Sequence, residues 1–263
     1  MTAQNTIKSH PFSEENFLRA AQWIIPILLV TLWVISKASA SFKLQLLPSP
    51  VSEIHRTVDM FTDGTLVDYV FVSARRAFTG LIIGSVLGYV LGMITGLNKT
   101  FNAFLNTTVQ MLRTIPMLAY QPIMIIFLGI GDELIVFMVS MGVFFSMYLN
   151  TYAGVQGLDK GLDEMARVYG FTRREYFFDV VLPGSMPNVL VGVRIALGSM
   201  WMMLIAAESV SGNSGLGYMA ARAREYLQMD RIFMILFIYA FFGKMSDTIA
   251  TSLENYFLRW RKT

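Results

Sequence analysis

Apolar side chains occur along this chain in six continuous runs, most of them close to 20 residues long, with polar segments between them. A helix needs about 20 mostly apolar residues to cross the hydrocarbon core of a bilayer. Because the runs do not alternate between apolar and polar positions, they predict helices and not barrel strands. We therefore expect an all-α membrane protein of about six transmembrane helices. The predicted spans cover residues 20–36, 77–97, 104–128, 134–152, 187–207 and 232–250.

The second run carries a regular pattern of small residues. Glycine recurs there at every fourth position, which places all of these glycines on one helix face. A second helix can approach this face closely, and dispersion contacts then hold the pair together within lipid. The pattern predicts helix packing and no chemistry. The glycines concerned are Gly80, Gly84, Gly88, Gly92 and Gly96.

The composition agrees with a membrane location. Hydrophobic residues make up 54% of the chain and charged residues only 15%, whereas an ordinary soluble domain has about 25% charged residues. The chain has no cysteine and only two histidines, so cysteine chemistry is excluded and no metal site is expected. The formal net charge of +3 does not indicate a nucleic-acid partner.

The beginning of the chain does not resemble a cleaved signal peptide. Polar residues fill much of positions 1–16, and only a weak cleavage pattern, at 38–40, follows the first apolar run. We expect this run to be retained as a helix. The expected organisation is a cytoplasmic segment at 1–19, a first transmembrane helix with an outer loop at 20–65, and a core at 66–263.

Basic residues indicate which side of the membrane each loop faces, because cytoplasmic loops carry an excess of lysine and arginine. With both termini inside, ten basic residues lie on the cytoplasmic side and eight outside, Arg75 and Arg76 among the latter. The basic run at 259–262 is the clearest inside marker. The sequence thus favours a multi-pass protein with both termini in the cytoplasm.

The longest polar stretch assigned to the inside, at about 159–183, reads as two short helices joined at a glycine. Asp159 or Asp163 can cap the first helix, and Gly170 stands where a helix would end in a left-handed residue. Thr172 and Glu175 have the spacing of a capping box for the second helix. Two prolines, at 183 and 187, then punctuate the start of the next span. We call this predicted projection the elbow.

The elbow resembles the EAA motif of ABC importer permeases. That motif reads Glu-Ala-Ala, three residues, Gly, nine residues, Ile, one residue, Leu-Pro, and every spacing matches. The two departures are Met165 for Ala and Val180 for Ile, both similar in size and polarity. The matching residues are Glu164, Met165, Ala166, Gly170, Val180, Leu182 and Pro183.

From about residue 46 onward the chain is similar to the nitrate/sulfonate/taurine group of these permeases. The segments 110–113, 164–167, 211–215 and 222–228 are most similar to aliphatic sulfonate permeases. The resemblance implies a type I importer (MetI-like) fold and import of a small organic anion, namely an aliphatic sulfonate. The alternative substrates within the family are taurine, nitrate or another small molecule. The resemblance also implies that the elbow is the coupling helix that docks into an ATPase subunit.

The same resemblance implies the partners. They are two ATPase subunits, a second copy of this chain, a periplasmic or lipid-anchored binding protein, and the lipid of the bacterial inner membrane. The sequence contains no Gly-x-x-x-x-Gly-Lys-Ser/Thr loop, so ATP and Mg are expected on the partner ATPase, with no cofactor in this chain.

Two other classes of protein are less consistent with the sequence. A secondary transporter driven by an ion gradient often shows inverted repeats and a buried acid near mid-membrane. No repeat is visible here, and Asp247 is the only acid inside a predicted span. A membrane-embedded enzyme would need a nucleophile–base set, and no catalytic residues are predicted.

Charged and small residues inside the spans are candidates for the substrate path. A charge within the membrane is a functional hypothesis by default, although a long side chain can instead reach the interface or pair with an acid. A face of small residues suits a narrow path or close helix packing equally well. The path candidates are Arg113, Arg194, Gly192, Ala196 and Ser199.

The segment after the fifth span is the candidate outer gate or binding-protein contact. Glu208 ends that span, where either an ion pair with Arg222 or Arg224 or a solvated helix end fits the sequence. The small residues that follow suit a flexible connector or a loop that closes the path. The residues assigned to this role are Glu208, Gly212, Asn213, Gly215 and Gly217.

In the last span, Lys244 and Asp247 are three residues apart and are expected to pair.

Overall fold

The computed structural model describes residues 21, 24–38 and 49–259, and every regular element in this part is helical. The chain divides into two compact units, Met1–Arg56 and Thr57–Thr263. The first contains α2 (Ile24–Ala38) and the start of α4 (Pro50–Thr62). The predicted N-terminal segment at 1–19, residues 39–48 of the predicted outer loop and the basic marker after Arg259 lie outside the described residues.

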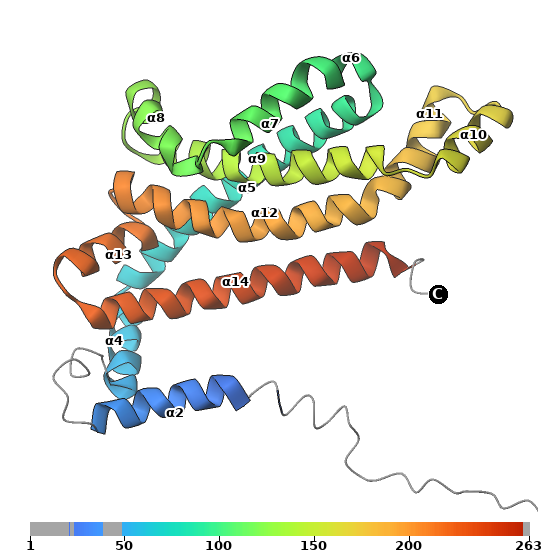
Figure 1. The fold of residues 1–263 in the computed structure, drawn as a ribbon. Coiled ribbons are helices and arrows are strands. Elements are labelled where there is room, and N and C mark those ends of the chain that lie inside the picture. Colours follow the sequence, from blue (N-terminus) through green and yellow to red (C-terminus); the bar gives the residue numbers. More distant parts are fainter. Residues whose placement is uncertain (1–20, 22–23, 39–48, 260–263) are drawn as a thin grey trace, which may run out of the picture. The chain divides into compact units, whose positions relative to one another are not determined.

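The second unit is built on four long helices, which Figure 1 shows with the shorter elements between them. The long helices are α5 (Thr65–Leu97), α9 (Asp132–Gln156), α12 (Leu182–Ser211) and α14 (Met229–Phe257). The shorter elements are α6 (Lys99–Phe101), η1 (Asn102–Asn106), α7 (Thr107–Thr114), η2 (Met117–Tyr120), α8 (Gln121–Leu128), α10 (Lys160–Val168), α11 (Arg173–Glu175), η3 (Tyr176–Val181) and α13 (Leu216–Glu225).

The all-α prediction is confirmed for the described residues. Four helices are long and apolar enough to cross a membrane, and a bent pair supplies a fifth crossing if it counts as one span. Large apolar side chains such as Ile82, Ile126 and Phe241 are well exposed, as expected where lipid covers the surface. The count of six spans stays a prediction, because α2, described over 15 residues, is too short for the same test.

The third predicted span is not one straight helix. It consists of Lys99–Thr114 and Met117–Leu128, which meet at an angle of 95°. Proline disfavours helical backbone in the residue before it, and Ile115 is accordingly extended, with φ −73° and ψ 126°. The Tyr120 hydroxyl bridges the break by donating to the Leu112 carbonyl at 2.7 Å. The prediction missed this bend because averaging hydropathy over a window does not register a single proline.

The fifth span is longer than predicted. Instead of a short helix followed by a span at 187–207, the helix is continuous from Arg173 to Ser211. It contains a π-helical turn at Tyr176–Val181 immediately before Pro183. A proline ring clashes with the carbonyl four residues earlier, here that of Asp179, and a wider π turn relieves this clash. The two prolines therefore do not separate the elbow from the span.

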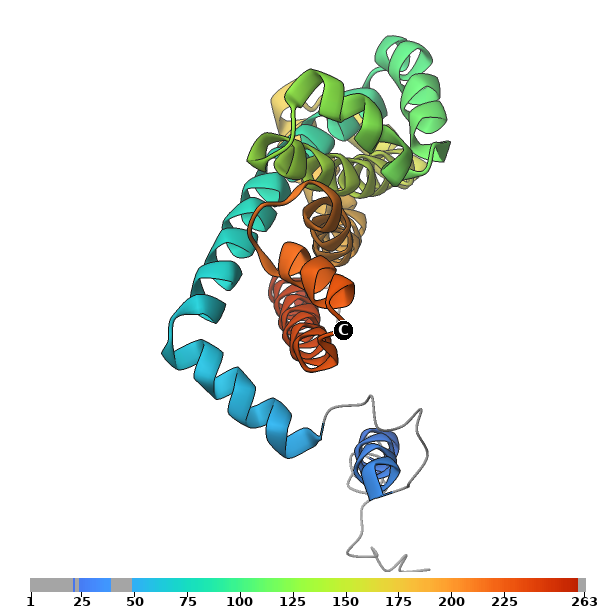
Figure 2. The same ribbon diagram turned by 90° about the vertical axis from the view of Figure 1, so that its left-hand side faces the viewer.

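The core of the second unit lies where α9 packs between α5 and α12, an arrangement visible in Figures 1 and 2. Leu134 and Met138 of α9 and Met200 and Leu204 of α12 are almost fully buried in one apolar cluster. Trp201 at its edge stacks on Phe242 of α14, with ring centroids 4.8 Å apart. These contacts hold α12 between α9 and α14.

The five regularly spaced glycines of α5 all face α9. A Cβ built on Gly80 would lie 2.6 Å from Cγ1 of Val139, and one on Gly88 would lie 2.7 Å from the Phe144 carbonyl oxygen. Real Cβ atoms do not approach other atoms so closely. The absence of side chains on this face therefore sets the distance between the two helices.

Replacing Gly88 with alanine should destabilise the protein by about 1–3 kcal/mol, the usual cost of overpacking. The new methyl group would meet backbone of α9, which cannot rotate away. Gly198→Ala on α12 is the matched control, because its Cβ would have nothing within 4 Å. Thermal unfolding of the purified variants in detergent measures the difference. Equal midpoints for the two variants would contradict this account of the glycine face.

Candidate functional site

The predicted elbow is the part of the second unit where α10 and α11 lie side by side, at the end where α9 stops and α12 begins (Figure 1). Its first helix starts at Asp159, whose carboxylate accepts a hydrogen bond from the Gly161 N–H at 2.9 Å. One turn later, Asp163 pairs with Arg167 at 2.9 Å across the helix surface. An acid near the start of a helix and a base near its end both suit the helix dipole.

Gly170 makes the turn between the two helices. Its φ of +70° is left-handed, a conformation that costs other residues roughly 1–2 kcal/mol. The Gly170 N–H donates to the Arg167 carbonyl at 3.2 Å, and the Phe171 N–H donates to the Ala166 carbonyl at 2.9 Å. This pair of hydrogen bonds is a Schellman motif, which ends α10 at a defined angle.

A capping box fixes the start of the following helix. The Thr172 N–H donates to a carboxylate oxygen of Glu175 at 2.7 Å, and the Glu175 N–H donates to the Thr172 hydroxyl at 3.3 Å. These bonds satisfy backbone donors that would otherwise lack partners at a helix start. The turn at Gly170 and this cap together give the elbow one backbone geometry.

The residues of the EAA-like motif fall into a buried group and an exposed group. Ala166 and Val180 are buried, and Leu182 packs on a small apolar cluster at the base of the elbow. Glu164 and Met165 face outward on α10. The buried group holds the elbow to the bundle, and the exposed group is available to a partner.

The elbow also exposes apolar side chains beyond the motif. Val168 is 84% exposed and Tyr169 is 76% exposed, with Leu162 on the same short helix at 41%. A cluster of exposed apolar residues on a rigid, charged helix is typical of a protein–protein contact. We call Leu162, Glu164, Met165, Val168 and Tyr169 the elbow face.

The structure places the candidate path residues of α12 in helix contacts. A Cβ on Gly192 would lie 2.9 Å from Cβ of Asn150 on α9, and Ala196 is fully buried in the main cluster. The Ser199 hydroxyl donates to the Ala196 carbonyl at 3.0 Å. In this structure the small-residue face of α12 is thus largely a contact with α9.

Arg194 pairs with acids of the neighbouring helix, one of the alternatives left open by the sequence. Its guanidinium lies 3.5 Å from Asp247 and 3.3 Å from Glu254, both on α14. Lys244 lies 3.6 Å from the same Asp247, as its spacing predicted. Arg113, in the last turn of α7, is exposed.

Glu208 is neither solvated nor paired with Arg222 or Arg224, so both sequence-based alternatives are wrong. It is fully buried. Its carboxylate accepts hydrogen bonds from Arg76 at 2.9 Å, from the Ser73 hydroxyl at 2.8 Å and from the Gly217 N–H at 2.8 Å. The reason is that α5 begins at Thr65, well before the predicted span, which brings Ser73 and Arg76 inside the bundle.

Arg76 extends this network to two further elements. It donates to Asp132 at the start of α9 at 2.9 Å and to the Ser214 carbonyl at 2.7 Å. Arg75, which is 60% exposed, contacts the same Asp132. We call Ser73, Arg76 and Glu208, together with the partly exposed Asp132, the buried ion network.

The small-residue loop after α12 is fixed in place by this network and is not a flexible connector. The Leu216 N–H donates to the Ser73 hydroxyl at 2.8 Å. A Cβ on Gly215, whose φ is +102°, would overlap the Glu208 carboxylate, and Gly212 and Gly217 are also packed against Glu208. Asn213 is the exposed member of the loop.

Sequence reasoning missed Ser73, Arg76 and Asp132 as functional candidates. It assigned Arg76 to a loop, although a basic residue directly before one apolar run and an acid, Glu208, directly after another are a signal for a pair inside the bundle. The described residues contain no group of three or more side chains that could hold a metal ion.

Comparisons with known proteins agree with this architecture. The family described as "Binding-protein-dependent transport system inner membrane component" matches residues 84–257. A putative aliphatic sulfonates transport permease protein of Escherichia coli is 42% identical over 92% of both chains. Its namesake from Bacillus subtilis is 32% identical over 91% of this chain and 87% of its own. The taurine transport system permease protein of Escherichia coli is 27% identical over 90% of this chain and 87% of its own.

Among solved structures, a chain of the MetNI methionine ABC transporter in an inward-facing conformation aligns with a TM-score of 0.63. The alignment covers 73% of this chain and 95% of that one at 17% sequence identity. At that identity the likeness concerns the fold alone. The fold is that of MetI-like permeases.

Proposed function

We propose that this chain, which belongs to the family of inner membrane components of binding-protein-dependent transport systems, carries an aliphatic sulfonate into the cell. The chain is a permease subunit of an ABC importer. Identity of 42% to a relative named as an aliphatic sulfonates permease supports the substrate. Taurine and nitrate permeases are 27% identical and supply the alternative substrates within the family.

The observation that carries the coupling proposal is the rigid elbow with its exposed face. A Schellman turn at Gly170 and a capping box at Thr172 fix the backbone. Met165, Val168 and Tyr169 leave apolar surface uncovered on the same helix. We infer that an ATPase subunit covers this surface, so that its movement is passed to α12, which continues directly from the elbow.

The assembly proposed on this basis contains two copies of this chain and two ATPase subunits, which hold ATP and Mg. The elbow and both termini then face the cytoplasm, and the buried ion network lies toward the outer side of the inner membrane. A soluble or lipid-anchored binding protein delivers the substrate to that side. Asn213 and its loop are the candidates for contact with the binding protein.

Uptake of butanesulfonate into vesicles containing the permease, its ATPase and the binding protein should require both internal ATP and the binding protein. Taurine and nitrate, added as unlabelled competitors, rank the alternative substrates. An ionophore that collapses ion gradients should leave uptake unchanged. Uptake that stops with the ionophore and continues without ATP would instead identify a secondary transporter.

A further inference from the structure

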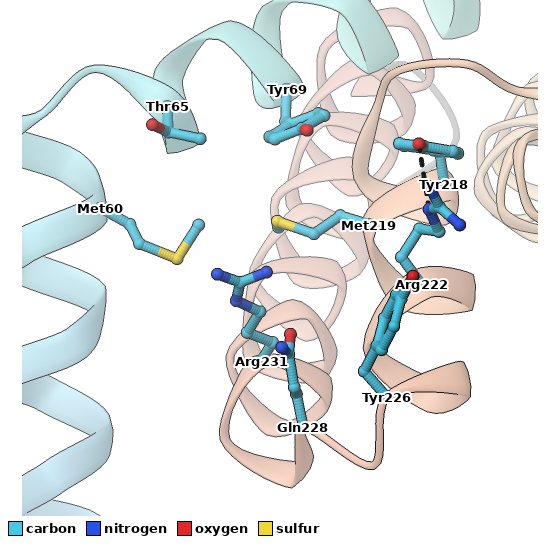
Figure 3. Close-up of a pocket in the computed structure, with 9 residues that line it drawn as sticks. All are labelled: Met60, Thr65, Tyr69, Tyr218, Met219, Arg222, Tyr226, Gln228 and Arg231. Atoms are coloured by element: carbon cyan, nitrogen blue, oxygen red, sulfur yellow. Dashed lines mark hydrogen bonds between the residues drawn. The ribbon is translucent and has the colours of Figure 1, made fainter.

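A pocket lies at the end of the second unit opposite the elbow, between the start of α5, α13 and the first turn of α14 (Figures 1 and 3). Its accessible volume is about 430 Å³, within the range of small-molecule sites. None of its lining residues belongs to the buried ion network, the elbow, the candidate path or the candidate outer gate. The lining residues are Met60, Thr65, Tyr69, Tyr218, Met219, Arg222, Tyr226, Gln228 and Arg231.

Arg231 is the residue that indicates a ligand. Its Nε is buried and has no hydrogen-bond partner in the part of the chain that the structure describes. In the view of Figure 3 the guanidinium projects between Met60 and Met219 into the space of the pocket. A buried guanidinium nitrogen without a partner is costly, and the planar donors of the group match the oxygens of an anion.

Arg222 adds a second positive charge to the same pocket. The guanidinium lies over the rings of Tyr218 and Tyr226, at 5.6 and 5.8 Å from their centroids. Its Nε donates to the Tyr218 hydroxyl at 3.1 Å, and Glu225 lies 3.4 Å away on the exposed side. A guanidinium is always protonated in proteins, so this charge is permanent.

Apart from Thr65 and Gln228, the rest of the wall is apolar or aromatic. Met60, Met219 and the ring of Tyr69 line the space beside Arg231. Thioether and ring surfaces suit a short aliphatic group and offer little to an ion without a hydrocarbon part, such as nitrate. The pocket therefore combines two cationic groups with a surface for hydrocarbon.

Backbone strain marks the chain segment that closes the pocket. Leu227 has a φ of +52°, the one positive φ of a non-glycine residue among the described ranges. It stands between two lining residues, Tyr226 and Gln228, and the Gln228 N–H donates to the Ala223 carbonyl at 2.8 Å. Such strain costs of order 1–3 kcal/mol and persists where the surroundings enforce it.

We infer that this pocket is a binding site on the permease itself. Its ligand is an anion with a sulfonate-type head and a short aliphatic body. The head binds Arg231 with support from Arg222, and the aliphatic body lies against Met60 and Met219. The assignment rests on the proposed function and deepens it, because it names a place on the outer side where the permease holds its substrate.

Direct binding to the permease–ATPase complex tests the inference. Butanesulfonate is titrated calorimetrically into the complex in nanodiscs of phosphatidylcholine, without binding protein or ATP. We expect saturable binding, weakened at least tenfold by Arg231→Gln and by Arg231→Lys. The matched control is Arg224→Gln, which removes the same charge from an exposed residue of α13 outside the pocket and should change binding less than twofold. The neutral butanesulfonamide should not compete.

Three outcomes would overturn the assignment. One is no saturable binding to the wild-type complex, and another is equal binding by the wild type and Arg231→Gln. The third is loss of butanesulfonate binding in nanodiscs of phosphatidylglycerol, which would show that an anionic lipid headgroup fills the pocket. Because no transport is measured, failure here leaves the uptake experiment valid, and failed uptake leaves this titration valid.

Discussion

Replacing Gly170 with valine should remove most of the stimulation that loaded binding protein gives to ATP hydrolysis, at least tenfold in reconstituted vesicles. The left-handed φ of +70° at this position is disfavoured for any side chain and most of all for a β-branched one. No atom lies within 4 Å of the position that a Cβ would take. The effect therefore comes from the backbone, which must leave its turn and reorient the elbow face.

Two further variants distinguish the effect of the Gly170 turn from the effect of the elbow face that the turn positions. Gly170→Asn should retain much of the stimulation, because asparagine tolerates left-handed backbone. Glu164→Lys should weaken ATPase association without altering the turn, since this side chain is exposed. Expression and membrane insertion should be normal in all three, because the elbow lies outside the apolar runs. Full stimulation in Gly170→Val would show that this segment is an ordinary loop.

Replacing Arg76 with leucine should destabilise the folded protein by about 3–5 kcal/mol, the cost of leaving one partner of a buried ion pair uncompensated. Arg76 and Glu208 are 2% and 0% exposed, so water cannot replace the missing charge. Thermal unfolding in detergent reports the loss. Arg75→Leu is the matched control, because this neighbouring side chain is 60% exposed and a surface pair contributes about 0–1 kcal/mol.

The double variant Arg76→Leu/Glu208→Leu distinguishes a missing charge from lost packing. Because it removes both charges, its destabilisation should be smaller than the sum of the two single variants. Additive effects would mean that the two residues act independently. An unfolding midpoint of Arg76→Leu equal to that of Arg75→Leu would contradict the importance of the buried ion network.

The elbow was readable from the sequence because its determinants are local. A cap, a left-handed glycine and a capping box each act over a few residues, and Asp159, Gly170 and the pair Thr172–Glu175 adopt the geometry that their spacing suggested. The glycine pattern of α5 is equally local, since its period alone places it on one face.

The buried ion network was not readable in the same way. Arg76 and Glu208 are separated by 132 positions in the chain, and only the packing of α5 against α12 brings them together. The second predicted span begins only at Ala77, because the charged residues before it lower the mean hydropathy. A paired charge can nevertheless lie inside a bundle. The contact between Gln121 and Ser211, at 3.1 Å, escaped prediction for the same reason.

The helix from Arg173 to Ser211 is continuous, so it connects the elbow rigidly to Glu208 at the other end of the second unit. Its 39 residues correspond to a length of about 58 Å at about 1.5 Å per residue. Tilting such a rod by about 5° about one end displaces the other by about 5 Å, roughly one helical turn. A small rotation of the helix imposed at the elbow would thus displace Glu208 by more than the length of a hydrogen bond. The hydrogen bonds of the buried ion network would then break.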